Sequence, residues 1–564
     1  MKQIINKVSS KHIFIFFTIL ILFFSLRYIS QLSIPTFLND ELGYLANAAF
    51  LAGKNWSGVT RISAYYSYGY SLIIAPLFLI LKNTELLYKT IILFNICFYI
   101  ISYYISFKTI KDLFKKVDTK IIAFVCGVVA LYGANIYNVN YAWVEPITYL
   151  IFWLLIYQLN CIYKNAQIKN IFIFSFLLCY IYIIHQRTIG VVLVGILCMI
   201  CMFKNKNIDK KKIILFFVYM FLFMIIGILI KKYIYVYLWN NTVSEKTATL
   251  NTYDGQIAKI IALIQSPTLI WNLIRGIIGK YYYLFISTGG LISFGVIQSL
   301  KRIKETYIVK KQIDVVFLFM ILSLFAMIVI SSLFFIRAER LDTLLYGRYN
   351  EFAMLPLFIC GILAFIEKKF SIKDYVLNLA LLFVCYIAVK GFLSGIRNYI
   401  FPCTVNASMF YIKLEHAFSF NKYMFTGIVL FTLVYLLITR KQLLLKCVAF
   451  LILISFWNAS VSSAMDQDKL LAQNHISQLQ SIVENITENK PIYYIYDGNY
   501  EDNYSRWFIG DIQFMMPNKT ILLTTTKEVG NLKDCYIITY EQELEGIKYK
   551  EIHNKVNYRL YLAR

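Results

Sequence analysis

An adjacent pair of acidic residues near the N-terminus is the first feature of this sequence that could do chemistry. Asp40 and Glu41 open a short helical pattern that runs from Asn39 to Ala49. The surrounding chain is apolar and basic, with a formal net charge of +25. Carboxylates at the edge of a bilayer are costly, so the pair suggests catalysis or cation binding. The alternative is structural, because acidic residues in the first turn of a helix also stabilise its dipole.

Arginine is the second informative residue type. The 564 residues include 13 Arg against 43 Lys, so Lys is the usual source of positive charge. Arginine binds phosphate through two parallel hydrogen bonds and is weakly hydrated, which suits a half-buried anion site. The arginines could instead pair with Glu339, Asp342 and Glu351 or with lipid headgroups. Seven arginines are predicted on the same membrane face as Asp40: Arg61, Arg187, Arg275, Arg337, Arg340, Arg348 and Arg397.

Further polar residues are expected on that same face. Glu145 lies in a predicted turn, His185 and Arg187 close an apolar run, and Tyr349 follows Arg348 just before another. Each residue alone is a weak signal, since a loop Glu is usually solvated and a single His at a helix end usually caps it. Their convergence favours a site that joins a lipid-borne substrate to a water-borne one.

Membrane-spanning helices must position these residues. Hydrophobic residues make up 59% of the chain and the mean hydropathy is +0.62, which indicates a polytopic α-helical membrane protein whose partner is the lipid bilayer and no nucleic acid. The first apolar run is expected to be retained, because no small-residue cleavage site follows it. Thirteen spans are predicted: 13–30, 86–107, 121–136, 147–160, 170–184, 189–203, 213–231, 281–299, 314–335, 352–366, 375–393, 423–439 and 445–462.

Positive charge predicts the orientation of these spans. If the N-terminus is cytoplasmic, seven short inner segments carry 26 Lys and Arg, as the positive-inside rule requires. The C-terminus and the loops 31–85, 232–280 and 394–422 would then be external. Tyr70 to Leu81 is apolar but too short to span, and Pro76 interrupts it, so we expect it in the outer interface. The inner segments are 1–12, 108–120, 161–169, 204–212, 300–313, 367–374 and 440–446.

The last hundred residues, 464–564, differ in character from the transmembrane part, 1–463. A polar helix is predicted over 467–489 and a second helix around 504–515. A segment of about a hundred residues is long enough for a core of its own. We therefore expect a small external α/β domain. Its predicted strands are 491–496, 520–525, 535–540 and 557–562.

The order of these features resembles that of the GT-C membrane glycosyltransferases, in particular the protein O-mannosyltransferase and aminoarabinose transferase group (glycosyltransferase family 39-like). The matching residues are Asp40 and Glu41 in the first loop, the segment 65–77, and the second acidic position Glu145. The thirteen spans and the external C-terminal domain match as well. The resemblance implies that Asp40 is catalytic, with Glu41 and Glu145 as further acidic contributors. Other site candidates are Tyr44, Tyr66, Tyr68, His185 and Tyr349.

The resemblance also implies the reaction. A sugar would arrive on a polyprenyl phosphate and be transferred with inversion, on the external face of the cell membrane, to a glycan, lipid or protein acceptor of the cell envelope. The aminoarabinose branch has a charged pair before prolines in the interfacial segment, where this chain has Tyr66-Ser67-Tyr68-Gly69. The donor-phosphate ligands are therefore expected from arginine chemistry alone, as Arg61, Arg187 and Arg348.

Metal use and loop closure complete the expectations. The chain has no clear metal-binding motif, and a divalent metal held by Asp40 and Glu145 stays an open alternative. The loop 232–280 contains amphipathic patterns at 257–264 and 269–278, and we expect it to close over the donor and exclude water.

Other functions share part of this pattern. A flippase or transporter of lipid-linked oligosaccharides should carry ionisable residues in mid-span and a repeated architecture, whereas the predicted ionisable residues lie at helix ends. A polysaccharide polymerase or ligase would share the substrate and the external arginines. It would not require an acidic pair directly after the first helix. A non-catalytic sensor is a third alternative.

Overall fold

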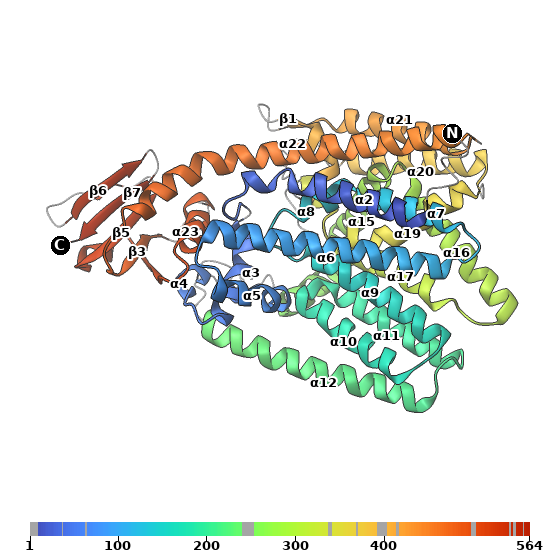
Figure 1. The fold of residues 1–564 in the computed structure, drawn as a ribbon, viewed down its shortest axis with the longest axis horizontal. Coiled ribbons are helices and arrows are strands. Elements are labelled where there is room, and N and C mark those ends of the chain that lie inside the picture. The colour runs from blue at the N-terminus through green and yellow to red at the C-terminus, as the bar shows by residue number, and fades with distance from the viewer. Residues whose placement is uncertain are drawn as a thin grey trace.

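The structure is a helical bundle with a small sheet at one end, which we call the C-terminal domain (Figure 1). Arg337, Arg340 and Arg397, and residues 240–252 of the predicted 232–280 loop, lie outside the described residues. The computed structural model describes residues 9–36, 38–61, 65–239, 253–336, 341–367, 370–391, 403–412, 417–440, 442–497, 503–540, 543–544, 549–555 and 558–563.

Long apolar helices form most of the bundle. Within the described ranges, nine helices are long and apolar enough to cross a membrane, or ten if one bent pair counts as a single span. The chain is therefore a multi-pass membrane protein, and the count of thirteen spans stays a prediction. The nine are built on α2 (Ser10–Leu26), α6 (Thr84–Leu113), α9 (Glu145–Lys164), α11 (Ile189–Lys204), α12 (Lys210–Ile234), α17 (Val315–Phe334), α20 (Ile372–Lys390), α21 (Phe420–Ile438) and α22 (Leu443–Glu484).

Shorter elements complete the bundle. Three predicted spans are apolar helices of fewer than 18 residues: α7 (Thr119–Ala130), α10 (Ile168–Ile184) and α19 (Glu351–Ile366). The short connecting helices and strands are η1 (Ile29–Gln31), α8 (Gly133–Asn138), η2 (Gln186–Thr188), η3 (Tyr235–Trp239), α18 (Leu341–Leu344), η5 (Val405–Phe410), β1 (Tyr411–Ile412) and β2 (Ala417–Phe418).

The predicted span 281–299 is wrong as a single helix. The chain forms α15 (Pro267–Ser287) and α16 (Leu291–Lys310), separated at Gly289 and Gly290, whose φ angles are 56° and 75°. Glycine adopts this left-handed conformation without steric cost, and hydropathy does not detect such a break. Before α15 the chain bends by 113° from α14 (Tyr253–Gln265), so both amphipathic patterns of the predicted loop are helical.

The segment between α2 and α6 packs onto the bundle as three helices. They are α3 (Leu38–Leu51), α4 (Ser57–Thr60) and α5 (Gly69–Ile80). The predicted interfacial segment is thus a helix, and Ser71 Oγ on α5 donates a hydrogen bond of 2.7 Å to the carbonyl of Tyr44 on α3. This contact fixes α5 against the helix that carries the acidic pair.

The C-terminal domain contains a five-stranded mixed sheet in the order β4-β3-β5-β7-β6. Strands β3, β4 and β5 are parallel, and β7 pairs antiparallel with β5 and β6. Each of the four predicted strands is present, and β6 was missed because its sequence, Tyr-Lys-Glu-Ile-His-Asn-Lys, is mostly polar. The elements are β3 (Ile492–Ile495), α23 (Asn503–Met515), β4 (Ile521–Thr524), η7 (Val529–Asn531), β5 (Cys535–Tyr540), β6 (Tyr549–Lys555) and β7 (Tyr558–Ala563).

This domain directly contacts the first-loop helices α3 and α4, and also α6. Trp56 Nε1 donates to the carbonyl of Pro517 at 3.1 Å, and the Tyr88 ring lies edge-on to Phe514 with centroids 6.0 Å apart. At Gly58 a Cβ atom would lie 1.8 Å from the carbonyl oxygen of Ile521, so only glycine allows α4 to approach β4 this closely. Helix α22 enters the domain without a break at residue 464.

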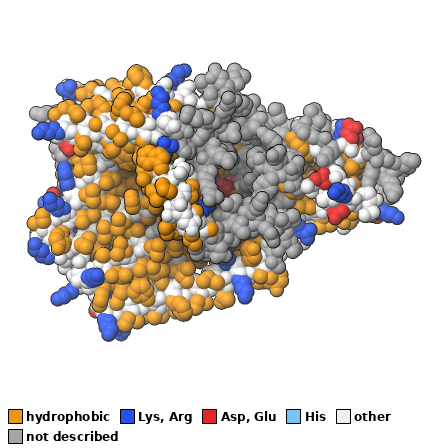
Figure 2. All heavy atoms as spheres, turned by 180° about the vertical axis from the view of Figure 1, so that it is seen from behind, with side chains coloured by type: hydrophobic (Ala, Val, Ile, Leu, Met, Phe, Trp, Pro, Cys, Tyr) orange, Lys and Arg blue, Asp and Glu red, His pale blue; other side chains and the backbone are white. Residues whose placement is uncertain are grey.

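The outer surface fits a membrane environment. On the face shown in Figure 2, hydrophobic side chains cover the bundle, and Lys and Arg gather along the rim farthest from the C-terminal domain. This distribution agrees with the predicted inner face, although membrane orientation itself stays a prediction.

Candidate active site

Helix α3 directs its two acidic residues to different neighbours. Successive residues of a helix point about 100° apart. Glu41 is fully buried: its Oε1 accepts from Tyr88 OH at 2.5 Å and from the backbone N–H of Ala142 at 2.6 Å. Its Oε2 accepts from the backbone N–H of Thr36 at 2.9 Å. Glu41 therefore joins three segments of the chain and faces away from Asp40.

Asp40 lies on the more open side of the same helix turn. Its Oδ1 accepts a hydrogen bond of 2.8 Å from Tyr66 OH, and its Oδ2 is 2.6 Å from Arg348 Nη1. The side chain remains 31% exposed. Burial alone would raise the pKa of Asp40, but the Arg348 charge and the Tyr66 hydrogen bond together hold it below its usual value. Asp40 is therefore an ionised acceptor at neutral pH.

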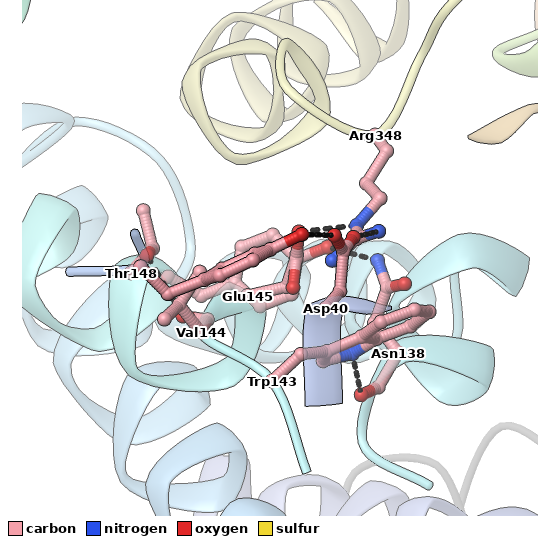
Figure 3. A network of polar contacts seen from close by, with 9 residues as sticks. Asp40, Asn138, Trp143, Val144, Glu145, Thr148 and Arg348 are labelled. Atoms are coloured by element: carbon pink, nitrogen blue, oxygen red, sulfur yellow. Dashed lines mark hydrogen bonds and ion pairs between the residues drawn. The ribbon is translucent and has the colours of Figure 1, made fainter. Parts of the chain in front are cut away.

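Arg348 bridges Asp40 and Glu145, which are far apart in the sequence (Figure 3). Its Nε donates to Glu145 Oε1 while its Nη1 donates to Asp40. The Arg348 side chain is only 5% exposed, and its guanidinium carbon lies 3.8 Å from the centre of the Trp143 ring. Trp143 is held in turn by Nε1, which donates to the carbonyl of Asn138 at 2.6 Å. The Asp40 and Glu145 carboxylates thus flank the Arg348 guanidinium, which contacts the Trp143 ring through a cation–π interaction.

Two glycines permit the close packing around this cluster. A Cβ on Gly43 would lie 2.1 Å from the ring of Tyr66, and a Cβ on Gly347 would lie 2.0 Å from the ring of Tyr283. The Tyr44 ring meets Tyr66 edge-on at 5.3 Å. Gly43 thus allows Tyr66 to reach the adjoining turn of α3 and to bond Asp40.

Arg187 lies beside this cluster without a carboxylate partner in the part of the chain that the structure describes. Its guanidinium carbon lies 3.7 Å from the centre of the Phe334 ring and 4.2 Å from that of Tyr349. Cation–π contact stabilises the charge but does not neutralise it. The side chain therefore keeps its capacity to bind an anion.

A small cavity separates Arg187 from Glu145. Its volume is about 20 Å³, enough for one water-sized group. Glu145 Oε2 is buried and has no hydrogen-bond partner among the described residues. The lining consists of Val144, Glu145, Thr148, Tyr149, His185, Arg187, Thr188, Met327, Arg348, Tyr349 and Phe352.

His185 is a neutral member of this lining. Burial, together with the charges of Arg187 and Arg348, lowers the pKa of the imidazole well below its usual value. Its Nδ1 accepts from the backbone N–H of Arg187 at 3.2 Å, which leaves the ring proton on Nε2. His185 is thus a hydrogen-bond donor rather than a second cation.

Some predicted site residues lie elsewhere. Tyr68 donates to the carbonyl of Gly227 at 2.6 Å, a packing contact with α12. Arg61 caps α4, whose neighbours are η3 and β4, and it does not line the cavity. Arg348 does not pair with Glu351. That carboxylate accepts instead from Tyr132 and Tyr283.

Sequence reasoning missed three neighbours of the site. Trp143 was visible beside Glu145, but nothing in the sequence placed it under Arg348. Lys280 is fully buried, with Nζ 3.2 Å from the carbonyl of Thr343 and 5.9 Å from the ring centre of Phe335, which stacks on Tyr349. The distribution of arginine in the sequence did not point to this Lys in an apolar helix. Asp511 on α23 is buried, and its position near Glu41 depends on the docking of the C-terminal domain.

This chain is similar to known proteins in structure rather than in sequence. No protein-family model and no curated protein sequence matches this chain. The structure resembles ArnT from Cupriavidus metallidurans bound to undecaprenyl phosphate, with a TM-score of 0.55, 10% identity and 97% of each chain covered. For the same protein in the apo state the TM-score is 0.54, with 9% identity and 97% of each chain covered.

A third solved structure is the archaeal oligosaccharyltransferase AglB from Archaeoglobus fulgidus, with a TM-score of 0.45 and 10% identity, covering 95% of this chain and 70% of that one. The two ArnT structures establish the fold because they cover almost the whole chain. The predicted resemblance is thereby confirmed at the level of the fold: this chain folds as a GT-C membrane glycosyltransferase does.

Proposed function

We propose that this protein is a glycosyltransferase that moves a sugar from a polyprenyl-phosphate donor to an acceptor hydroxyl. The observation that carries the proposal is Arg187, which forms no ion pair with a carboxylate among the described residues and lies beside the ion-paired cluster of Asp40, Arg348 and Glu145. The fold supports it, since the similar ArnT structure is bound to undecaprenyl phosphate.

Arg187 is the proposed ligand of the donor phosphate. An anion beside it gains a positive charge that is not already bonded to a carboxylate of the described residues, and a planar fork of donors. Arg348 is already bonded to two carboxylates, so its proposed role moves from phosphate binding to holding Asp40 and Glu145 in place. Arg61 stays a weaker candidate because it does not line the cavity.

The cavity next to Arg187 is the proposed position of the reacting end of the sugar. Glu145 Oε2 offers a buried acceptor without a partner in the described ranges, and a sugar hydroxyl would satisfy it. A volume of about 20 Å³ is too small for a whole sugar, so the donor must displace lining side chains as it enters. The amphipathic helices α14 and α15 are the proposed cover of the bound donor.

Asp40 is the proposed residue that receives the acceptor. An ionised carboxylate has about four lone-pair positions, and the contacts with Tyr66 and Arg348 use two of them. Its partial exposure leaves a path for the acceptor hydroxyl. In the reaction that oxygen attacks the anomeric carbon, its proton passes to Asp40, and the anomeric carbon–oxygen bond breaks toward the phosphate. Attack in line with the leaving group inverts the anomeric centre.

The proposal includes the topology. Asp40, the cavity and the C-terminal domain, residues 464–564, would face the exterior, with the N-terminus in the cytoplasm. The acceptor would be a glycan, lipid or protein of the cell envelope. A flippase, or a polymerase or ligase that uses lipid-linked glycans, is the alternative function, and it would also bind polyprenyl phosphate.

The test measures binding and transfer with the full chain in lipid nanodiscs. Undecaprenyl phosphate should bind the wild type, and Arg187→Lys should weaken that binding at least tenfold, because Lys keeps the charge but loses the planar fork. Lys115→Arg, in the predicted inner segment 108–120, is the matched control and should change nothing.

Transfer is followed as label leaving a radiolabelled polyprenyl-phosphate sugar, with pentose and hexose donors compared. Asp40→Asn should lower transfer by about two orders of magnitude, while undecaprenyl phosphate binding persists. Absence of lipid-phosphate binding by the wild type would refute the donor class. Normal transfer by Asp40→Asn would refute the role of Asp40, and binding without transfer of any sugar tested would favour the flippase.

A further inference from the structure

The carboxylates around Arg348 converge as they would around a bound cation. In this site the cation is the Arg348 guanidinium itself. Two carboxylates from separate elements, Asp40 on α3 and Glu145 at the start of α9, converge on one point. The guanidinium of Arg348 occupies that point, with Nη1 2.6 Å from Asp40 Oδ2 and Nε bonded to Glu145 Oε1. The Trp143 ring also contacts the guanidinium, whose carbon lies 3.8 Å from the ring centre.

A divalent metal does not fit this arrangement. Ions such as Mg²⁺ or Mn²⁺ require about six oxygen ligands at close to 2.1 Å. The part of the chain that the structure describes contains no group of three or more His, Cys, Asp or Glu side chains placed to hold a metal. The carboxylate oxygens that face the centre already accept N–H donors from Arg348, whose fixed positive charge would repel a second cation.

We infer that Arg348 takes the place of a divalent metal in this active site. Its delocalised charge is shared between Asp40 and Glu145 and orients the Asp40 carboxylate toward the acceptor side. Burial alone would lower the pKa of the guanidinium, but the two carboxylates raise it above its usual value, so Arg348 remains protonated. Lys could not substitute, because one ammonium lacks the planar fork that bonds both carboxylates while the guanidinium carbon lies against the Trp143 ring. The catalytic part of this inference rests on the proposed function, and the cation-binding part does not.

Cation binding is tested first, with Mn²⁺ as the probe. The full chain in nanodiscs is titrated with Mn²⁺, and free Mn²⁺ is measured by electron paramagnetic resonance. The wild type should show no site that depends on Asp40, whereas Arg348→Ala should gain one Mn²⁺ site that Arg348→Ala/Asp40→Asn loses. Arg302→Ala is the matched control: Arg302 also pairs with an aspartate, Asp314, and lies 4.4 Å from an aromatic ring centre. Among the described residues it forms an ion pair with that one carboxylate only, so its removal should create no site.

Two outcomes of this titration overturn the inference. One is a stoichiometric Mn²⁺ site in the wild type that disappears in Asp40→Asn. The other is an Arg348→Ala protein that elutes and melts like a folded protein yet gains no Mn²⁺ site. If Arg348→Ala does not fold, the wild-type titration alone still decides.

The transfer assay adds an independent readout. Wild-type transfer should be unchanged by EDTA, and a loss of more than tenfold that Mn²⁺ restores would overturn the inference. If no sugar is transferred at all, the proposed function fails while the Mn²⁺ titration still decides the identity of the cation.

Discussion

Replacing Glu41 by Gln should reduce stability much more than it reduces chemistry. The two Glu41 oxygens receive different donors: Oε1 accepts from Tyr88 and Ala142, and Oε2 accepts from Thr36. A glutamine can keep its carbonyl toward Tyr88 and Ala142, but its NH₂ group would then face the Thr36 N–H. One charge-assisted hydrogen bond is lost and two become neutral.

The magnitude follows from these contacts. A hydrogen bond to a charged group contributes about 1.5–3 kcal/mol and a neutral one about 0.5–1.5 kcal/mol. Part of the loss is offset because a neutral side chain costs less to bury. We therefore expect Glu41→Gln to lower the free energy of unfolding by about 3 kcal/mol. Transfer by the folded fraction should fall less than tenfold, since Asp40 keeps its own partners.

The assay is a double-mutant cycle on equilibrium unfolding in detergent, with Tyr88→Phe as the second change. Tyr88→Phe should cost about 1.5–3 kcal/mol, and the pair should show a coupling of about 1 kcal/mol. The matched control is Tyr68→Phe, which removes an equally buried hydroxyl that donates to a neutral carbonyl and should cost about 1 kcal/mol. An unchanged unfolding curve for Glu41→Gln, together with complete loss of transfer and intact lipid binding, would show that Glu41 is a reacting group.

Two further perturbations test the surroundings of α3. Gly43→Ala should slow transfer and lower the melting temperature despite the better helix propensity of alanine, because its Cβ would meet the Tyr66 ring; an unchanged rate would mean that the Tyr66 bond to Asp40 is dispensable. Asp511→Asn should stabilise the protein increasingly as the pH rises above about 4, as followed by thermal unfolding between pH 5 and 8.5. Burial and the charge of Glu41 raise the pKa of Asp511, so the folded wild type binds a proton that the unfolded chain releases, and its stability falls with pH. An equal pH dependence of the two proteins would contradict this.

Most helices and strands could be predicted, because the pattern of apolar residues within each segment determines them. The apolar runs became helices, and the runs at 491–496 and 535–540, rich in Ile and Tyr, became the strands β3 and β5. The exception at Gly289 and Gly290 has a physical reason, because a run can be uniformly apolar and still contain a backbone conformation that ends a helix.

The site was predictable in its members but not in its pairings. Asp40 and Arg348 are 308 residues apart, and Glu145 and Arg348 are 203 residues apart, so only the packed structure brings them together. The sequence indicated that arginine mattered, but it could not distinguish Arg348, which is bonded to two carboxylates, from Arg187, which forms no ion pair with a carboxylate among the described residues. The different orientation of Glu41 could be predicted from the sequence, because two adjacent residues of a helix point about 100° apart.

The unbroken passage of α22 from bundle to sheet restricts how this architecture can vary in length. A helix rises about 1.5 Å and turns about 100° per residue, so one inserted residue near 464 would rotate the C-terminal domain away from its contacts with α3 and α4. Seven residues make nearly two whole turns and would restore the angle, but they would lift the domain by about 10 Å. The distance between the helical bundle and the sheet is thus set by the number of residues in α22. Variation in length is confined to the loops, and a transplanted C-terminal domain would need α22 to end in the same rotational phase and at the same height.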